Sequence, residues 1–548
     1  MRDQSCWDKT WRRPIGRRGF VHGLLLGSAG LALGATIGCE NKTATGGAGT
    51  PASGGQTTAS PSGQATPQPV RGGTLIVVQP NDIMAKNLAH AVNPPNYYLL
   101  PNVYERLTHY KIEKLEAEPE LAESWKFAPD YTSLTVKLRQ GVKFHTGRPL
   151  TAEDVKWNLE WVAKPEAASQ LMNVAKGVVK IDIPDPYTLN LQFDQPRPSF
   201  LDAFEALFIA DPQTFQEAQD GKRYVGTGPF VFKEWVPGDH FTLTRNPDYW
   251  QKGLPYLDEI TMKVIPDAQT RLVNLQTGAA DIAVTLDPRD LKDLQKDKNF
   301  FVTSHPIMTS VWYVGIDVKA EPFTDKRVRQ AIAYLLDRRR IVDTQLLFGE
   351  PTVIPWDKLS PAYDAELAQR NQYNPAKAKE LLTQAGLAGG ATVSLYPSGS
   401  YPETGPIVEM LQAELTKLGW KTSIEKLASA EMIQKLNTGQ FRGLWCSLVG
   451  YMHMTPSTLF INSYPFRVPN GSNFDTPQYR QLINDIVKET DEAKLKTIYR
   501  QINEVIVDEC FLCPVASVER PLAVSAKVKG LKLSRSGMPI QYGIWKSK

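Results

Sequence analysis

The stretch VGTGPFVFKEWVPGDHFTLTRNPDYW, residues 225–250, has the pattern of a β-hairpin. Its GTGP opening and its central PGD each predict a turn, because glycine and proline interrupt regular structure. Residues 230–235 form the first predicted strand. In the second strand Phe241 and Leu243 alternate with threonines, which is the period-two pattern of a half-buried strand. The NPD sequence then ends that strand, since proline cannot continue a ladder.

The length and composition favour a globular protein with more than one core. A chain of 548 residues is too long for a single hydrophobic core, and fractions of 42% hydrophobic and 22% charged residues are ordinary for folded domains. The formal net charge of +4 is confined to residues 1–38, which hold six basic and two acidic residues. The remainder holds 56 of each sign, so no nucleic-acid partner is expected.

Residues 1–38 have the pattern of an export signal. Arg17-Arg18, followed by Gly-Phe-Val, precedes an apolar run that is too short and too rich in Gly and Ala for a membrane span. This order resembles a twin-arginine signal. Ile37-Gly38-Cys39 resembles a lipoprotein cleavage site with Cys39 as the lipidated residue, although Thr36 stands where leucine is usual. The alternative is an incidental cysteine in a plain signal peptide.

Residues 39–70 are expected to be a disordered tether. From residue 41 onward they consist almost wholly of Gly, Ser, Thr, Ala, Pro and Gln, which cannot bury enough apolar surface to offset the entropy of ordering. Thirty flexible residues have a root-mean-square reach of roughly 30 Å. The expected location is therefore the outer face of the cytoplasmic membrane or the periplasm, with the body anchored through Cys39.

From residue 71 onward, strand and helix patterns mix without a strict βαβ rhythm, which indicates α/β lobes with chain crossings. Thr151 and Asp154 predict a capping box at the start of a helix. Other predicted helices begin after cap residues Asp267, Asp325 and Asn374. No later segment is long and apolar enough to span a membrane.

Eight segments, in order along the chain, resemble those of the extracellular solute-binding proteins of the oligopeptide/dipeptide/nickel family (family 5) of ABC importers, lipoprotein type. They are VYERL (103–107), PELAESW (119–125), LRQGVKFHTGRPLTAEDVKW (138–157), GTGPF with RNPDYW (226–250), PYLDEITMKVIPDAQTRLVNLQTGAADI (255–282), PFTDKRVRQAIAYLLDR (322–338), YNPAKAKELLTQAGL (373–387) and LTKLG (415–419). One such segment arises by chance, but eight in this order do not.

The resemblance implies a two-lobed, periplasmic-binding-protein-like clamshell (type II, cluster C) with an extra inserted domain. Lobe I would comprise 71–110, 225–318 and 515–548, the extra domain 111–224, and lobe II 319–514. The hairpin at 225–250 would then mark the return of the chain to lobe I.

The implied function is binding without chemistry. A peptide or other small solute would be enclosed between lobes that rotate about the connecting strands, and the closed form would deliver it to the permease subunits of an ABC importer. A monomer without a cofactor is expected. ATP would be hydrolysed by another subunit, which agrees with the lack of a G-x-x-x-x-G-K-[ST] motif in this chain.

The resemblance also implies which residues line the cleft. Three segments correspond to cleft-lining parts of the family: the one after the first strand, the strand that enters lobe II, and a lobe II loop at 443–453. The candidate residues that they contribute are Asn96, Tyr97, Tyr98, Trp312, Tyr313, Trp445, Cys446, Leu448, Tyr451 and His453. For each aromatic residue the alternative is packing in the core. If Trp445 lines the cleft, its substitution by alanine weakens binding without unfolding the protein.

Leu448 departs from the pattern of the peptide-binding members, which have an aspartate there that pairs with the amino terminus of the peptide. A leucine cannot pair with an ammonium group, and a buried ammonium without a partner is costly. Another carboxylate, such as that of Asp317, could substitute. Otherwise a neutral, sugar-like or amide solute stacked on tryptophan fits as well as a peptide.

Several residues resemble reactive or metal-binding sites. Cys510 and Cys513 have redox or zinc spacing, but zinc would need two more ligands, and the pair precedes a strand rather than opening a helix. The options are inert buried thiols or a disulfide, within the pair or with Cys446. A nickel or metal-chelate solute is the runner-up, which the scatter of the seven histidines disfavours; His453 is the one candidate contact. An exported hydrolase or redox lipoprotein is the rival class, which the lack of a G-x-S-x-G motif disfavours.

Overall fold

The computed structural model describes residues 68–84, 86–90, 94–303, 310–399, 401–450 and 453–547. The export signal, most of the tether, Cys39 and Tyr451 lie outside these ranges. The described chain mixes helices with several sheets, which confirms the predicted α/β class. None of the described helices combines the length and apolar character needed to cross a membrane.

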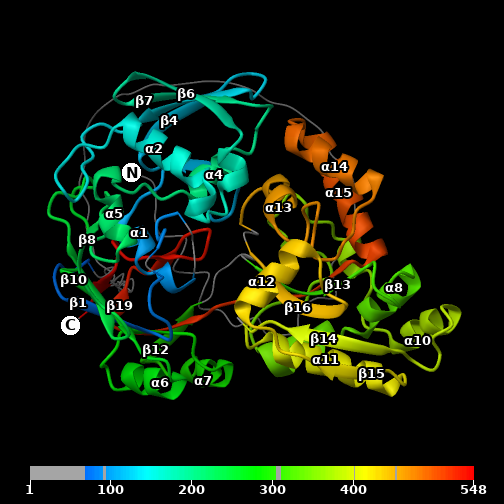
Figure 1. The fold of residues 1–548 in the computed structure, drawn as a ribbon. Helices are drawn as coiled ribbons and strands as arrows, with labels where there is room; N and C mark the ends of the chain where they lie inside the picture. The colour runs from blue at the N-terminus through cyan, green and yellow to red at the C-terminus, as the bar shows by residue number, and fades with distance from the viewer. Residues whose placement is uncertain are drawn as a thin grey trace, which may run out of the picture. The chain divides into compact units, whose positions relative to one another are not determined.

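A seven-stranded sheet contains the first strand and much of the chain after residue 230. Its order is β12 (Phe300–Thr303), β18 (Leu522–Ser525), β11 (Ile282–Val284), β1 (Thr74–Gln79), β10 (Glu259–Val264), β9 (His240–Arg245) and β8 (Phe230–Val236). β1 runs parallel to β10 and β11, while the remaining pairs are antiparallel. Helices α6 (Ala268–Gln276) and α7 (Pro288–Leu294) lie near β12 (Figure 1).

The predicted hairpin is confirmed as β8 and β9 of this sheet. The turn before it needs glycines, because a Cβ on Gly226 would lie 2.1 Å from the carbonyl oxygen of Val103, and one on Gly228 would lie 2.5 Å from that of Asn102. These close approaches press the turn against α1 (Leu100–Val103). The GTGP sequence therefore encodes a backbone packing contact as well as a turn.

A four-stranded sheet lies between these strands in sequence, in the order β4 (Ala122–Phe127), β5 (Ser133–Leu138), β7 (Thr188–Phe193) and β6 (Val178–Asp185). Helix α2 (Ala152–Val162) packs on it through Val155, Leu159 and Val162. The predicted capping box is present, with the Asp154 carboxylate accepting from the Thr151 backbone N–H at 2.8 Å. Shorter elements here are β2 (Thr108–Tyr110), β3 (Ala117–Pro119), α3 (Met172–Ala175), α4 (Leu201–Ala206) and α5 (Phe215–Gln219).

A five-stranded sheet has the order β15 (Lys421–Ile424), β14 (Thr392–Pro397), β16 (Gly443–Val449), β13 (Val311–Ile316) and β17 (Leu512–Ser517). β14 is parallel to β15 and β16, whereas β13 is antiparallel to β16 and β17. The expected lobe boundaries at 318 and 515 would assign β13 to lobe I and would divide β17 between the two lobes. Both strands belong to the sheet that the expected lobe II contains.

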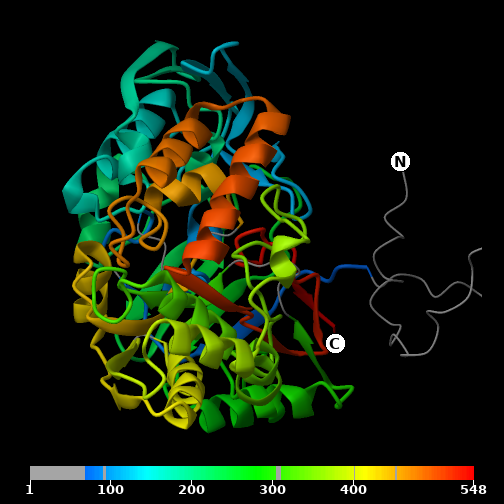
Figure 2. The same ribbon diagram turned by 90° about the vertical axis from the view of Figure 1, so that its right-hand side faces the viewer.

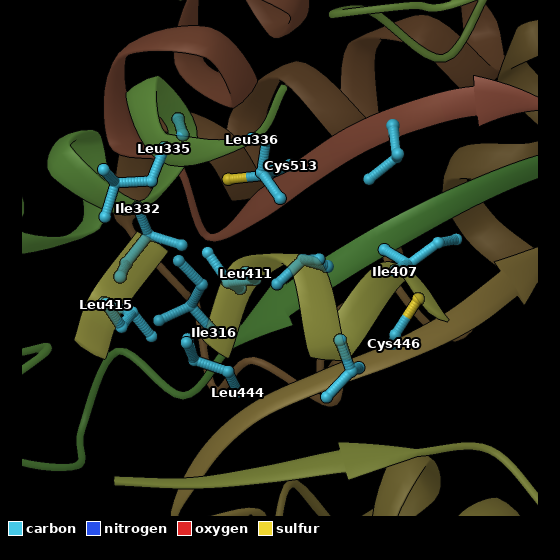
Figure 3. Close-up of a cluster of buried hydrophobic side chains, with 14 of the residues drawn as sticks. Ile316, Ile332, Leu335, Leu336, Ile407, Leu411, Leu415, Leu444, Cys446 and Cys513 are labelled. Carbon is cyan, nitrogen blue, oxygen red and sulfur yellow. The ribbon is translucent and has the colours of Figure 1, made fainter. Parts of the chain in front are cut away.

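Both faces of the five-stranded sheet are covered by helices. One face packs against α8 (Lys326–Leu335), α10 (Pro375–Gln384) and α11 (Thr404–Lys417), and Figure 3 shows Ile316, Leu444 and Cys446 meeting Ile407 and Leu411 there. The other face packs against α14 (Pro477–Lys488) and α15 (Glu492–Glu509), two helices that contact each other (orange in Figure 2). The predicted caps are confirmed: Asp267, Asp325 and Asn374 accept backbone N–H groups at 2.7, 2.8 and 3.0 Å.

Besides a few 3-10 and π-helical turns, some further α-helices and β-strands are described. They are α9 (Arg338–Ile341), α12 (Ser429–Thr438), α13 (Pro456–Asn462), β19 (Val528–Lys529), β20 (Lys532–Leu533), β21 (Pro539–Ile540) and β22 (Trp545–Lys546).

Candidate functional site

The predicted loop at 443–453 begins as a strand, and this corrects the sequence interpretation. Residues 443–449 form β16, a fully paired inner strand whose apolar run GLWCSLV is buried on both faces. Such a run lacks the alternation that usually identifies strands. Of the rest, Tyr451 lies outside the described residues.

The register between β13 and β16 divides the candidates between two faces of the sheet. Trp312 pairs with Leu448 and lies with Cys446 on the face that packs on α11. Tyr313 and Trp445 lie on the opposite face, in the core against α14 and α15. Because successive side chains point to opposite faces of a strand, these five residues do not share one surface.

Trp445 is part of the core. Its side chain is 2% exposed and stacks on Phe441 with ring centroids 4.0 Å apart. It also lies over Gly315, where a Cβ would come within 2.2 Å of the indole. Tyr313 is buried in the same cluster. The structure therefore places both residues where the core alternative expects them.

Trp312 lies near the start of β13 and contacts an aromatic residue that the sequence analysis missed. Its ring meets that of Tyr401 edge-on, with centroids 5.5 Å apart. Tyr401 follows the carboxyl end of β14 and is only partly buried, as is Leu448. Trp312 itself is buried, and Cys446 is fully buried on the same face of the sheet.

The three candidates after β1 have different environments. Asn96 is fully buried, and its side-chain oxygen accepts from the backbone N–H of Met84 at 2.9 Å, so it holds the loop together. Tyr98 is buried in the core of the seven-stranded sheet. Tyr97 is partly buried and packs at the edge of that core.

Tyr97, Tyr401 and Arg520, which we call a cluster, interact electrostatically and come from segments of both large sheets. Burial raises the pKa of both phenols, and the positive charge of Arg520 opposes that rise in each of them. The guanidinium group therefore acts on both phenols through its charge. Arg520 lies between β17 and β18, where the chain crosses from the five-stranded to the seven-stranded sheet. It is exposed and makes no hydrogen bond or ion pair with any residue that the structure describes.

Tyr401 of this cluster lies at the strand ends where ligands bind in open α/β sheets. The parallel strands β14 and β16 have their carboxyl ends there, and the antiparallel strand β13 begins there. Ligand sites form outside the carboxyl ends of such strands. Asp317 lies at the other end of β13, where its carboxylate accepts from Asn473 at 2.9 Å. The structure therefore places Asp317 away from Leu448, where it cannot replace the missing aspartate.

His453 is buried, and its main-chain carbonyl accepts from Arg535 Nε at 2.8 Å. Tyr401 and Arg520 are the residues that sequence reasoning missed. A signal for Arg520 was available, because a cation between two apolar strand patterns, 512–517 and 522–525, marks an exposed point in a crossing segment.

Cys446, Cys510 and Cys513 are free and buried. Cys510 Sγ donates to the Val507 carbonyl at 3.1 Å, and the hydrogen bond with Cys513, followed by burial, raises the pKa of Cys510. Among the described residues, no three His, Cys, Asp or Glu side chains gather in a way that would hold a metal ion.

Two surface hollows lie away from this cluster. One of about 460 Å³ is lined by residues of α14 and α15 and the turn between them, and one of about 400 Å³ by residues around Arg467 and Arg480. The first is lined mostly by polar or charged side chains, and the second by a mixture of apolar and polar ones. Neither includes a candidate residue.

Comparison with known proteins gives a consistent family. The description "Bacterial extracellular solute-binding proteins, family 5 Middle" matches residues 116–465. The glutathione-binding protein GsiB of Salmonella paratyphi A is 29% identical over 423 residues, which are 74% of this chain and 81% of that protein.

Solved structures agree with this fold. AgaA in complex with agropinic acid, from A. tumefacien R10, has a TM-score of 0.75 and 26% identity, over 87% of this chain and 99% of that one. NikA from Brucella suis in complex with Fe(III)-EDTA has a TM-score of 0.77 and 22% identity, over 87% and 100%. The latter similarity concerns the fold alone.

Proposed function

The chain belongs to the bacterial extracellular solute-binding proteins of family 5, and we propose that its solute is a small carboxylate-bearing molecule held at the Tyr97–Tyr401–Arg520 cluster. The general role is that of the family: it is the solute-binding component of an ABC importer. The proposal concerns the solute and the residues that hold it.

The exposed guanidinium of Arg520, which has no hydrogen bond or ion pair with any described residue, carries the proposal. Arginine binds carboxylates through two parallel hydrogen bonds, and the flanking phenols of Tyr97 and Tyr401 can each donate one more. Arg520 lies in a segment that crosses between two sheets, and each sheet region contributes one tyrosine. This arrangement suits an anionic group held between two lobes. The names of GsiB and AgaA support this reading, because glutathione and agropinic acid both carry carboxyl groups.

Leu448 further restricts the chemical class of the solute. It is partly exposed and lies opposite the buried Trp312 in the strand register, so the surface there presents an aliphatic side chain. This surface suits an uncharged part of the solute, since a buried ammonium would lack a partner there. An acylated or cyclised amino-acid derivative fits better than an ordinary peptide with a free amino terminus. Trp312, Tyr97 and Leu448 remain proposed contacts, with Tyr451 and His453 on the segment that follows β16.

The proposed architecture follows the sheets. Lobe I is built on the seven-stranded sheet, lobe II on the five-stranded sheet and the extra domain on the four-stranded sheet. The solute would stabilise the closed arrangement by its higher affinity for that state. The protein would act as a monomer without catalysis, tethered outside the membrane through Cys39 and delivering solute to the permease.

Native mass spectrometry of protein purified without denaturation tests the solute. We expect a co-purifying small molecule that, once released, is an acid, and its occupancy should fall at least about tenfold in Arg520→Gln, because a hydrogen bond to a charged group contributes about 1.5–3 kcal/mol. Arg289→Gln, an exposed arginine on α7, is the matched control. A neutral sugar mass, a metal chelate, or equal occupancy in Arg520→Gln would contradict the proposed class.

A further inference from the structure

Asp202 is a buried carboxylate that binds residues from a distant part of the chain. It lies on α4, is 1% exposed, and accepts from the Thr455 backbone N–H at 3.2 Å and from the hydroxyls of Thr455 and Thr458. These threonines lie at the start of α13. The carboxylate also accepts from the Tyr110 hydroxyl at 2.9 Å. Every hydrogen-bond donor is neutral, and the charge of Asp202 also attracts that of Arg535.

Arg535 is a buried cation that binds the same stretch of chain from another side. It lies in the turn between β20 and β21 and is 2% exposed. Its Nε donates to the His453 carbonyl at 2.8 Å, and its Nη1 donates to the carbonyls of Lys111 and Ile112. Its hydrogen-bond acceptors are main-chain carbonyls of two separate segments.

Asp202 and Arg535 each bind groups of the complementary kind on the segment between them. Residues 453–458, which we term the clamp segment, present a carbonyl to the cation and an N–H with two hydroxyls to the anion. The segment follows β16 after only a few residues, and β16 carries Leu448. Asp202 belongs to the chain around the four-stranded sheet, and Arg535 to the C-terminal chain that follows the seven-stranded sheet. Both ends of the clamp therefore reach the five-stranded-sheet part from outside it.

We propose that Asp202 and Arg535 form a two-ended clamp that holds the clamp segment when the five-stranded-sheet part closes on the rest of the protein. They are positioning residues: they act on the chain beyond β16 and stabilise the closed arrangement. This proposal concerns closure and is independent of the identity of the solute. Opening would deprive two buried charges of the partners that the clamp segment supplies, so the clamp makes closure an all-or-none step.

A pair of single hydroxyl deletions on the same carboxylate tests the Asp202 end. Thr458→Val removes a donor from across the contact, whereas Tyr110→Phe removes a donor from the Asp202 side, since the Tyr110 N–H binds Glu205 of α4 at 2.7 Å. The readouts are the radius of gyration from small-angle X-ray scattering and amide hydrogen exchange, both on the full chain as purified.

We expect Thr458→Val to enlarge the radius of gyration and to speed exchange in residues 453–463 by about tenfold, because the lost hydrogen bond is made to a charged group. Tyr110→Phe should leave the radius unchanged. If the two variants behave alike, or if exchange rises in Thr458→Val without any change in radius, Asp202 is only a local cap and the clamp is refuted.

A second pair tests the Arg535 end. Arg271 is a matched control, because it is also 2% exposed and donates only to main-chain carbonyls, those of Ile265, Pro266, Val284 and Thr285, all within one sheet region. Both Arg535→Gln and Arg271→Gln should lower the melting temperature, but only Arg535→Gln should enlarge the radius of gyration. An unchanged radius in Arg535→Gln, or fast exchange of the clamp segment already in the unsubstituted protein, would overturn the proposal.

Discussion

At the scale of single residues, neighbours in sequence have separate roles because a strand alternates. Trp445 and Cys446 are adjacent, yet their side chains enter two different cores. Trp312 and Tyr313 differ in the same way, and only Trp312 contacts Tyr401 at the proposed solute edge. A tryptophan in a cleft-lining segment can therefore be a core residue, and the register decides which it is.

Trp445→Ala should now destabilise the fold. The substitution removes a buried indole and its stacking on Phe441, which typically costs about 3–5 kcal/mol of unfolding free energy. The sequence alone predicts the opposite for this substitution, namely weaker binding in a protein that stays folded. Urea unfolding followed by circular dichroism measures it, with Trp445→Phe as the milder companion. An unchanged unfolding midpoint in Trp445→Ala would show that the indole is not needed by the core.

At the scale of elements, the hairpin is tied to the rest of its sheet by one buried glutamate. Glu105, just after α1, accepts from Thr227 Oγ1 and Tyr249 OH at 2.8 Å each, and from Trp250 Nε1 at 2.9 Å. These donors flank β8 and β9 on both sides. The GTGP and NPDYW sequences therefore form the turns and also supply the hydrogen-bond donors to the Glu105 carboxylate.

The titration of Glu105 should make the hairpin sensitive to pH. Burial, followed by the nearby charge of Glu120, raises the pKa of Glu105 from 4.5 to about 8, although its hydrogen bonds oppose the rise. In that window the folded protein keeps a proton that the unfolded chain releases, so this group lowers stability as pH rises from 4.5 to 8.

Glu105→Gln removes the titration while keeping the shape of the side chain. Urea unfolding of both proteins at several values between pH 5 and pH 8 gives the comparison. The stability advantage of the unsubstituted protein over Glu105→Gln should shrink as pH rises. Parallel stability curves would mean that Glu105 keeps one protonation state throughout the window.

At the scale of the whole molecule, the sequence predicted the fold better than the site. The hairpin, the capping box at Thr151 and the caps at Asp267, Asp325 and Asn374 were found because they depend on a few adjacent residues. Tyr401 and Arg520 were missed because they come together only when strands far apart in sequence are placed. The clamp has the same origin: 253 positions separate Asp202 from Thr455.

The anchor is the last whole-molecule feature, and it concerns residues 1–70. We predict that the exported chain fractionates with membranes and that Cys39→Ser releases it into the soluble exported fraction, because acyl chains on Cys39 would be the only apolar anchor on an otherwise polar tether. Replacing Arg17 and Arg18 together by lysine should leave unprocessed chain inside the cell, since the twin-arginine signal would be lost. Fractionation and the mass of the processed chain report both effects. If the unsubstituted chain and Cys39→Ser are cleaved at the same place and both are found in the soluble exported fraction, the leader is a plain signal peptide and Cys39 carries no anchor.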